Sequence, residues 1–74
     1  RFAMFKNVFG SDGKFHLENQ VGNIRYDLTT GESKTVYPVG SNTNMTFDNS
    51  GVHTEVQTGN MRYRLGESGF DWIL

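Results

Sequence analysis

The chain contains no cysteine, and it has only one proline (Pro38) and one tryptophan (Trp72) among 74 residues. Without cysteine it forms neither disulfides nor a thiolate zinc site, which are the usual means of stabilising a small domain. A domain of this length buries only about 60% of the surface that its unfolded chain exposes. The sequence therefore predicts marginal stability and support from a partner chain.

Long apolar runs and charge of a single sign are also missing. The apolar runs are far shorter than the roughly 20 residues that cross a bilayer as a helix, so membrane insertion is not expected. Seven basic and eight acidic residues give a net charge of −1, and no basic groove is apparent for nucleic acid. No catalytic motif, cofactor loop or nucleotide fingerprint is present, so we expect a non-enzymatic protein without a cofactor. The sequence does not indicate a compartment.

The sequence contains an internal repeat. Residues 16–28 (HLENQVGNIRYDL) align with residues 53–65 (HTEVQTGNMRYRL) with eight identities in thirteen positions, where chance would give about one or fewer. The similarity extends in weaker form on both sides of this block. We therefore expect a single domain, residues 1–74, built from two repeats of about 1–39 and 40–74.

Alternation of apolar and polar residues between turn-forming clusters predicts an all-β protein without helices. Each repeat is expected to form a four-stranded antiparallel unit. The expected strands are 2–9, 14–20, 23–29, 33–39, 43–48, 52–57, 60–65 and 69–74. The two units fit a small barrel, a two-sheet sandwich or two propeller-like blades, and blades would need several chains to close a ring.

Parity within the second hairpin of each repeat suggests a register. Placing Val21-Gly22 and Thr58-Gly59 in the turns pairs Glu18 with Arg25 and Glu55 with Arg62. The apolar side chains then face the core; they are Phe15, Leu17, Ile24, Tyr26 and Leu28 in the first repeat and Val52, Thr54, Val56, Met61, Tyr63 and Leu65 in the second.

The opposite face carries the candidate binding residues. They are identical in the two repeats and expected to be exposed: His16, Glu18, Gln20 and Arg25, with His53, Glu55, Gln57 and Arg62. Their simplest role is a cross-strand Glu–Arg ion pair in each repeat, and a contact to a partner carboxylate or a sugar is the alternative. A site of two histidines and two glutamates, or acid–base catalysis by these groups, is a weaker alternative, so no metal or catalytic residue is assigned.

Apolar residues at both ends of the chain predict an interface. Phe2, Met4 and Phe5 near the start and Trp72, Ile73 and Leu74 at the end place apolar groups on both faces of the terminal strands. Tyr37 and Trp72 occupy equivalent positions in the two repeats, where they serve either the core or a ligand platform.

Two functions are consistent with these features. The first is a non-catalytic structural or protein-interaction module that assembles with itself or with a larger protein. The second is a glycan-binding domain with one site per repeat, since duplicated β units can multiply weak sugar sites for avidity. Nucleic-acid binding is not expected.

Overall fold

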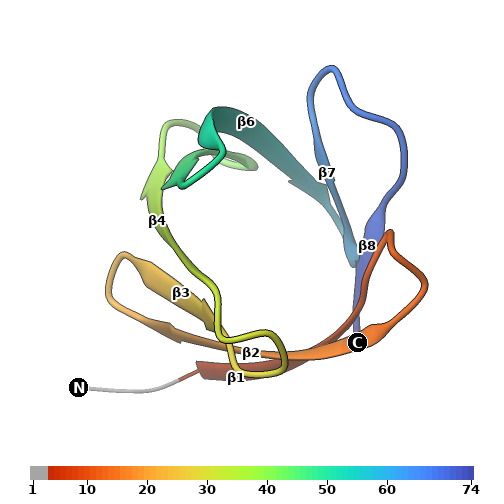
Figure 1. Cartoon of the computed structure of the whole chain (residues 1–74). Helices are drawn as coiled ribbons and strands as arrows, with labels where there is room; N and C mark the ends of the chain where they lie inside the picture. Colours follow the sequence, from red (N-terminus) through yellow and green to blue (C-terminus); the bar gives the residue numbers. More distant parts are fainter. Residues whose placement is uncertain (1–3) are drawn as a thin grey trace.

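The computed structural model describes residues 4–74, which form an eight-stranded closed antiparallel barrel. Each strand pairs with the next along the chain, and β8 returns to pair with β1 (Figure 1). The strands are β1 (Met4–Phe9), β2 (Phe15–Val21), β3 (Ile24–Asp27), β4 (Ser33–Pro38), β5 (Thr43–Asp48), β6 (Gly51–Thr58), β7 (Met61–Arg64) and β8 (Asp71–Ile73). All eight overlap the expected strands, and of the three architectures the barrel is the one observed.

None of the described residues forms a helix long and apolar enough to span a membrane. The predicted all-β class is confirmed.

The hairpin register differs from the expected one by two residues. Val21 pairs with Ile24 and Thr58 with Met61, so the turns are Gly22-Asn23 and Gly59-Asn60. Gly22 and Gly59 each have φ of 59°, a left-handed conformation at the first turn position, as in a type II′ turn. The expected register would put Val21 or Thr58 at that position, where a β-branched residue is strained. Glu18 therefore pairs with Asp27 rather than Arg25, and Glu55 with Arg64 rather than Arg62.

The assignment of faces was wrong. Glu18, Arg25, Glu55 and Arg62 were expected outside but are each at most 9% exposed. They point into the barrel with a small apolar set, Val8, Val36 and Ile73. Parity places the right residues together on one face, but it does not say which face is covered. In this barrel the charged face is the covered one.

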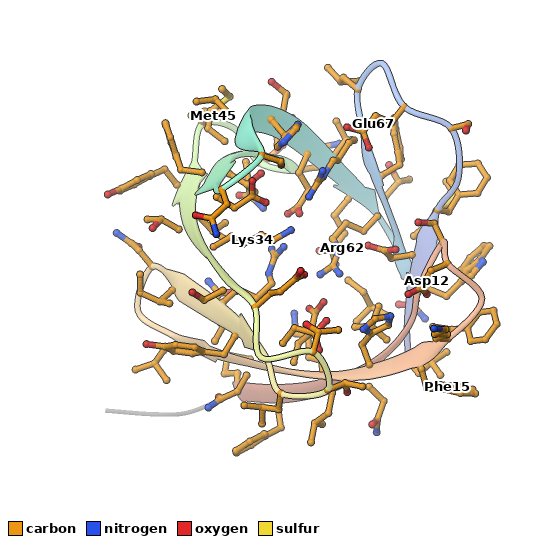
Figure 2. The ribbon with its side chains drawn as sticks, viewed as in Figure 1. Asp12, Phe15, Lys34, Met45, Arg62 and Glu67 are labelled. Carbon is orange, nitrogen blue, oxygen red and sulfur yellow. The ribbon has the colours of Figure 1, made fainter. Side chains whose placement is uncertain are left out.

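Most of the large apolar side chains lie on the outside of the barrel. Those exposed to solvent are Met4, Phe5, Phe15, Leu17, Val21, Tyr26, Leu28, Tyr37, Val39, Phe47, Val52, Leu65, Phe70, Trp72 and Leu74. Several pack against one another across neighbouring strands, with ring centroids 4.9 Å apart for Phe9 and Phe15 and 5.7 Å apart for Tyr37 and Phe47. Phe15 projects away from the barrel in Figure 2. The inside and the outside of this barrel are thus reversed relative to an ordinary soluble β domain.

Candidate functional site in the barrel lumen

Two ion pairs cross the middle of the lumen. Arg25 on β3 donates to both carboxylate oxygens of Glu55 on β6, at 2.7 and 2.9 Å. Arg62 on β7 donates to both oxygens of Glu18 on β2, at 2.9 and 2.8 Å. Planar guanidinium and carboxylate groups meet best in this two-bond geometry. The pairs that we expected within each hairpin are looser, at 3.9 Å for Arg25–Glu18 and 3.9 Å for Arg62–Glu55.

We call these four residues the charge layer. Hydrogen bonds and neighbouring opposite charges offset the cost of burying their charges. Burial raises the pKa of Glu55, but the hydrogen bonds and charge of Arg25 outweigh it, together with a 3.1 Å bond from Asn44, and bring the pKa down to about 2. Burial lowers the pKa of Arg62, but Glu18 reverses this and leaves it raised. Arg62 also donates to Asp71 on β8 at 3.1 Å. Two glutamates and two arginines give the layer no net formal charge.

A cavity lies on each side of the charge layer. The larger, about 300 Å³, opens among the turns that join β1 to β2, β3 to β4 and β7 to β8. The smaller, about 170 Å³, lies toward the other end, where Lys6, Gln20, Asn44 and Gln57 line it. Charge-layer residues line both cavities, so the layer separates them.

His16 joins two turns at the mouth of the larger cavity. Its Nδ1 lies 2.8 Å from Asp27 and its Nε2 lies 2.9 Å from Asp12. Burial lowers the pKa of His16, but the two carboxylates outweigh it, so the pKa is raised above 6.5. Asp12 accepts the Lys14 amide and Asp27 accepts the Thr29 amide, so these carboxylates also cap their own turns.

His53 has different neighbours from His16. Its Nε2 lies 2.7 Å from the Ser50 hydroxyl, and its Nδ1 lies 3.6 Å from Glu67. The order Ser50–His53–Glu67 is that of a serine triad. The Ser50 hydroxyl, however, donates to Asp48 at 2.6 Å, and Asp48 also accepts the Ser50 amide. A serine nucleophile donates its hydroxyl hydrogen bond to the histidine, whereas Ser50 donates to Asp48. The cluster therefore serves as the cap of the β5–β6 turn.

The eight predicted binding residues lie together, but in the lumen rather than on the surface. The glutamates and arginines form the charge layer, and the histidines hold turns at one end. Gln20 and Gln57 donate to the carbonyls of Gly22 and Gly59, at 3.2 and 3.3 Å, within their own hairpins. Each of the predicted residues thus has a polar partner, in the charge layer or in a turn at an end of the barrel.

The four-residue metal alternative finds no support. Glu18 and Glu55 are held by arginines, and the histidines by turn residues. Among residues 4–74 no group of three or more His, Cys, Asp or Glu side chains is arranged to hold a metal ion.

The predicted interface residues differ in exposure and position. Phe5, Trp72 and Leu74 are exposed, and their assignment to an interface stays a prediction. Met4 is exposed but lines the smaller cavity. Ile73, in contrast, is 8% exposed and packs in the lumen, and Phe2 lies outside the described residues. Tyr26 was expected in the core, and Tyr37 and Trp72 in the core or on a ligand platform; all three lie half exposed on the outer face.

Sequence reasoning missed several lumen residues. Asp27, Lys34, Arg64 and Asp71 line the larger cavity, and Asp12 lies at its mouth. A signal was available for two of them, because Asp27 and Arg64 follow Arg25 and Arg62 by two positions and therefore share their face.

The sequence matches no protein-family model and no curated protein, and no solved structure matches the chain.

Proposed function

We propose that this protein is a non-catalytic interaction module whose outer face assembles with further copies of the chain or with a larger protein. The observation that carries the proposal is the distribution of exposed apolar side chains. Seven strands each present at least one on the outer face, and Leu65 follows directly after the eighth, β7. Soluble monomers rarely expose continuous apolar patches larger than a few hundred Å².

The exposure does not come from a loose or open shape. The radius of gyration is 11.5 Å, and a compact chain of this length is expected to have about 11.3 Å. The lumen is already occupied by the charge layer, so the aromatic side chains cannot be buried by moving inward. Burying them requires a surface from outside the barrel.

We infer further that the chain is an internal duplication. Three pairs of like features support it: the matching turns at Gly22 and Gly59, the matching glutamine contacts in those hairpins, and the reciprocal ion pairs Arg25–Glu55 and Arg62–Glu18. A duplicated barrel carries two similar outer faces, so one molecule can contact two partners. Such an arrangement favours assemblies larger than a dimer.

Sedimentation at micromolar concentration tests the assembly. Phe5→Asp and Trp72→Ala change exposed side chains on the adjacent strands β1 and β8, and each is expected to shift the protein toward monomer by about tenfold or more in dissociation constant. Asn49→Asp is the matched control, because Asn49 is an exposed residue of the turn between β5 and β6 rather than of a strand's outer face, and its charge should leave the assembly intact.

Two outcomes overturn this proposal. One is a wild-type protein that remains a soluble, stable monomer at high concentration and also binds no other protein. The other is a protein that binds phosphatidylcholine vesicles and does not associate with itself or another protein, which would assign the outer face to lipid.

Glycan binding stays a prediction, and the geometry moves its expected residues from the surface into the lumen. Gln20 and Gln57 line the smaller cavity, so a sugar would have to enter there. The double change Gln20→Ala with Gln57→Ala should abolish glycan-array binding without affecting assembly if this function is correct. A wild-type protein that binds no glycan would exclude it.

A further inference from the structure

The larger cavity has the size of a small ligand site. Its volume of about 300 Å³ lies at the lower end of the range of about 300 to 1,000 Å³ for ligand pockets. It is open at one end of the barrel and closed at the bottom by the charge layer. A ligand can therefore enter without disturbing the outer face.

One wall of this cavity carries two cations with unused hydrogen-bonding capacity. Lys34 on β4 and Arg64 on β7 both approach Asp48 on β5, at 3.8 and 3.5 Å. Within residues 4–74 neither side chain makes a hydrogen bond, and both are only partly exposed. Arg64 also lies 3.6 Å from Glu67. Burial lowers the pKa of Lys34, and the charges of Arg64 and Arg25 lower it further, against the opposing charges of Asp48 and Glu55. Lys34 points into the lumen in Figure 2.

The rest of the cavity is negative. Seven carboxylates and four Lys or Arg side chains line it, a formal excess of three negative charges when His16 is neutral. Asp12 and Asp27 flank His16, and Glu32 stands at the rim. The overall negative charge disfavours a simple anion, and a simple cation would leave the donors of Lys34 and Arg64 without an acceptor. A molecule that carries both charges is favoured at both walls.

We propose that the larger cavity binds a small zwitterionic amino carboxylate. Its carboxylate lies between Lys34 and Arg64, where it supplies the acceptors that these donors lack and shares them with Asp48. Its ammonium group faces the Asp12–His16–Asp27 wall. Arg64 suits the carboxylate because its guanidinium fork can bind both oxygens. This site is separate from the outer face and does not depend on the assembly proposed above.

A homologous series of ligands can measure the distance between the two charged walls of the cavity. Glycine, β-alanine, γ-aminobutyrate and 6-aminohexanoate carry the same two charges at increasing separation. Calorimetric titration of the full chain is expected to give tightest binding for one member, about tenfold or more tighter than acetate or methylammonium, because only the zwitterion contacts both walls.

Variants locate the binding. Lys34→Met and Arg64→Met are each expected to weaken the preferred ligand by about tenfold or more, the effect of losing one charge-assisted contact. Lys14→Met is the matched control, because Lys14 is exposed and does not line the cavity, and it should bind as the wild type. Phe5→Asp should also retain binding, because it alters only the outer face.

Several results overturn the proposal. They are no binding by any member of the series, equal binding of acetate and the zwitterions, or equal loss in Lys14→Met. If Lys34→Met and Arg64→Met do not fold, ligand-induced shifts of the Lys34 and Arg64 side-chain signals in the wild-type NMR spectrum decide the question. Shifts confined to other residues would contradict the site.

Discussion

The inside and the outside of this barrel are made by the same strands and differ in almost every chemical respect. On β2, His16, Glu18 and Gln20 face the lumen, and Phe15, Leu17 and Val21 face outward. The charged side chains are buried and the aromatic ones are exposed. Alternation of polar and apolar residues along a strand separates the two faces of the sheet. In this barrel the charged face can be enclosed because its charges are paired.

The lumen tolerates charge because each charge there has a partner. An eight-stranded barrel has an interior just wide enough for side chains to fill. The two Glu–Arg pairs span it, with their hydrogen bonds satisfied and their charges cancelled. Buried pairs of this kind contribute little net stability against an apolar filling, but they are costly to break.

The largest expected effect comes from removing one member of the charge layer. Arg25→Met leaves Glu55 buried without its main partner, and we expect a loss of about 3 to 5 kcal/mol in the free energy of unfolding. Urea denaturation measures it. The double variant Arg25→Met with Glu55→Met should recover most of the loss, and Lys14→Met on the surface should change little. If Arg25→Met were as stable as the wild type, the Arg25–Glu55 pair would not be needed for the stability of the folded barrel.

Acid should unfold the protein through the same layer. The pKa of Glu55 is about 2 when folded, compared with 4.5 for a free glutamate, which corresponds to about 3 kcal/mol. Because the folded pKa is depressed, this stability is present above about pH 4.5 and is lost as the pH falls toward 2. Urea denaturation at a series of pH values measures the slope. Glu55→Gln should flatten the pH dependence, and an unchanged slope would contradict the assignment.

The outer face should respond less to a comparable truncation. Phe15 is 64% exposed and contacts Phe9 edge to face, so Phe15→Ala should lower the stability of the monomer by about 1 kcal/mol. A core phenylalanine would cost about 3 to 5 kcal/mol. Denaturation at a concentration where the protein is monomeric measures the difference. A core-sized loss would mean that Phe15 is covered in the folded molecule.

Much of the fold was predictable from local signals. Turn clusters and alternation located all eight strands, and parity placed Glu18, Arg25, Glu55 and Arg62 on one face. The register was missed by two residues because several turn placements conserve parity, and only the positive φ of Gly22 distinguishes them. Long-range contacts such as Arg25–Glu55 depend on closure of the barrel, which no local pattern encodes.

The candidate site was less predictable than the fold. Its histidines stood out because they repeat, but Lys34 and Arg64 have no counterpart of the same residue type in the other repeat. They come together only in the folded barrel, where Lys34 on β4 and Arg64 on β7 both approach Asp48 on β5. Their shared neighbour Asp48 was expected only as the last residue of the strand 43–48.

The seam between the first and last strands has a consequence for folding kinetics. β1 and β8 meet through Val8 opposite Ile73 and Phe9 opposite Trp72, with one further hydrogen bond from the Leu74 amide to the Asn7 carbonyl. All the other strand pairs join neighbours along the chain, so they form with short loops. Closing the seam requires a loop of more than sixty residues and has the greatest entropic cost. We therefore expect the sheet to assemble hairpin by hairpin in an open form. The slow step is expected to be the pairing of β1 with β8, which closes the barrel.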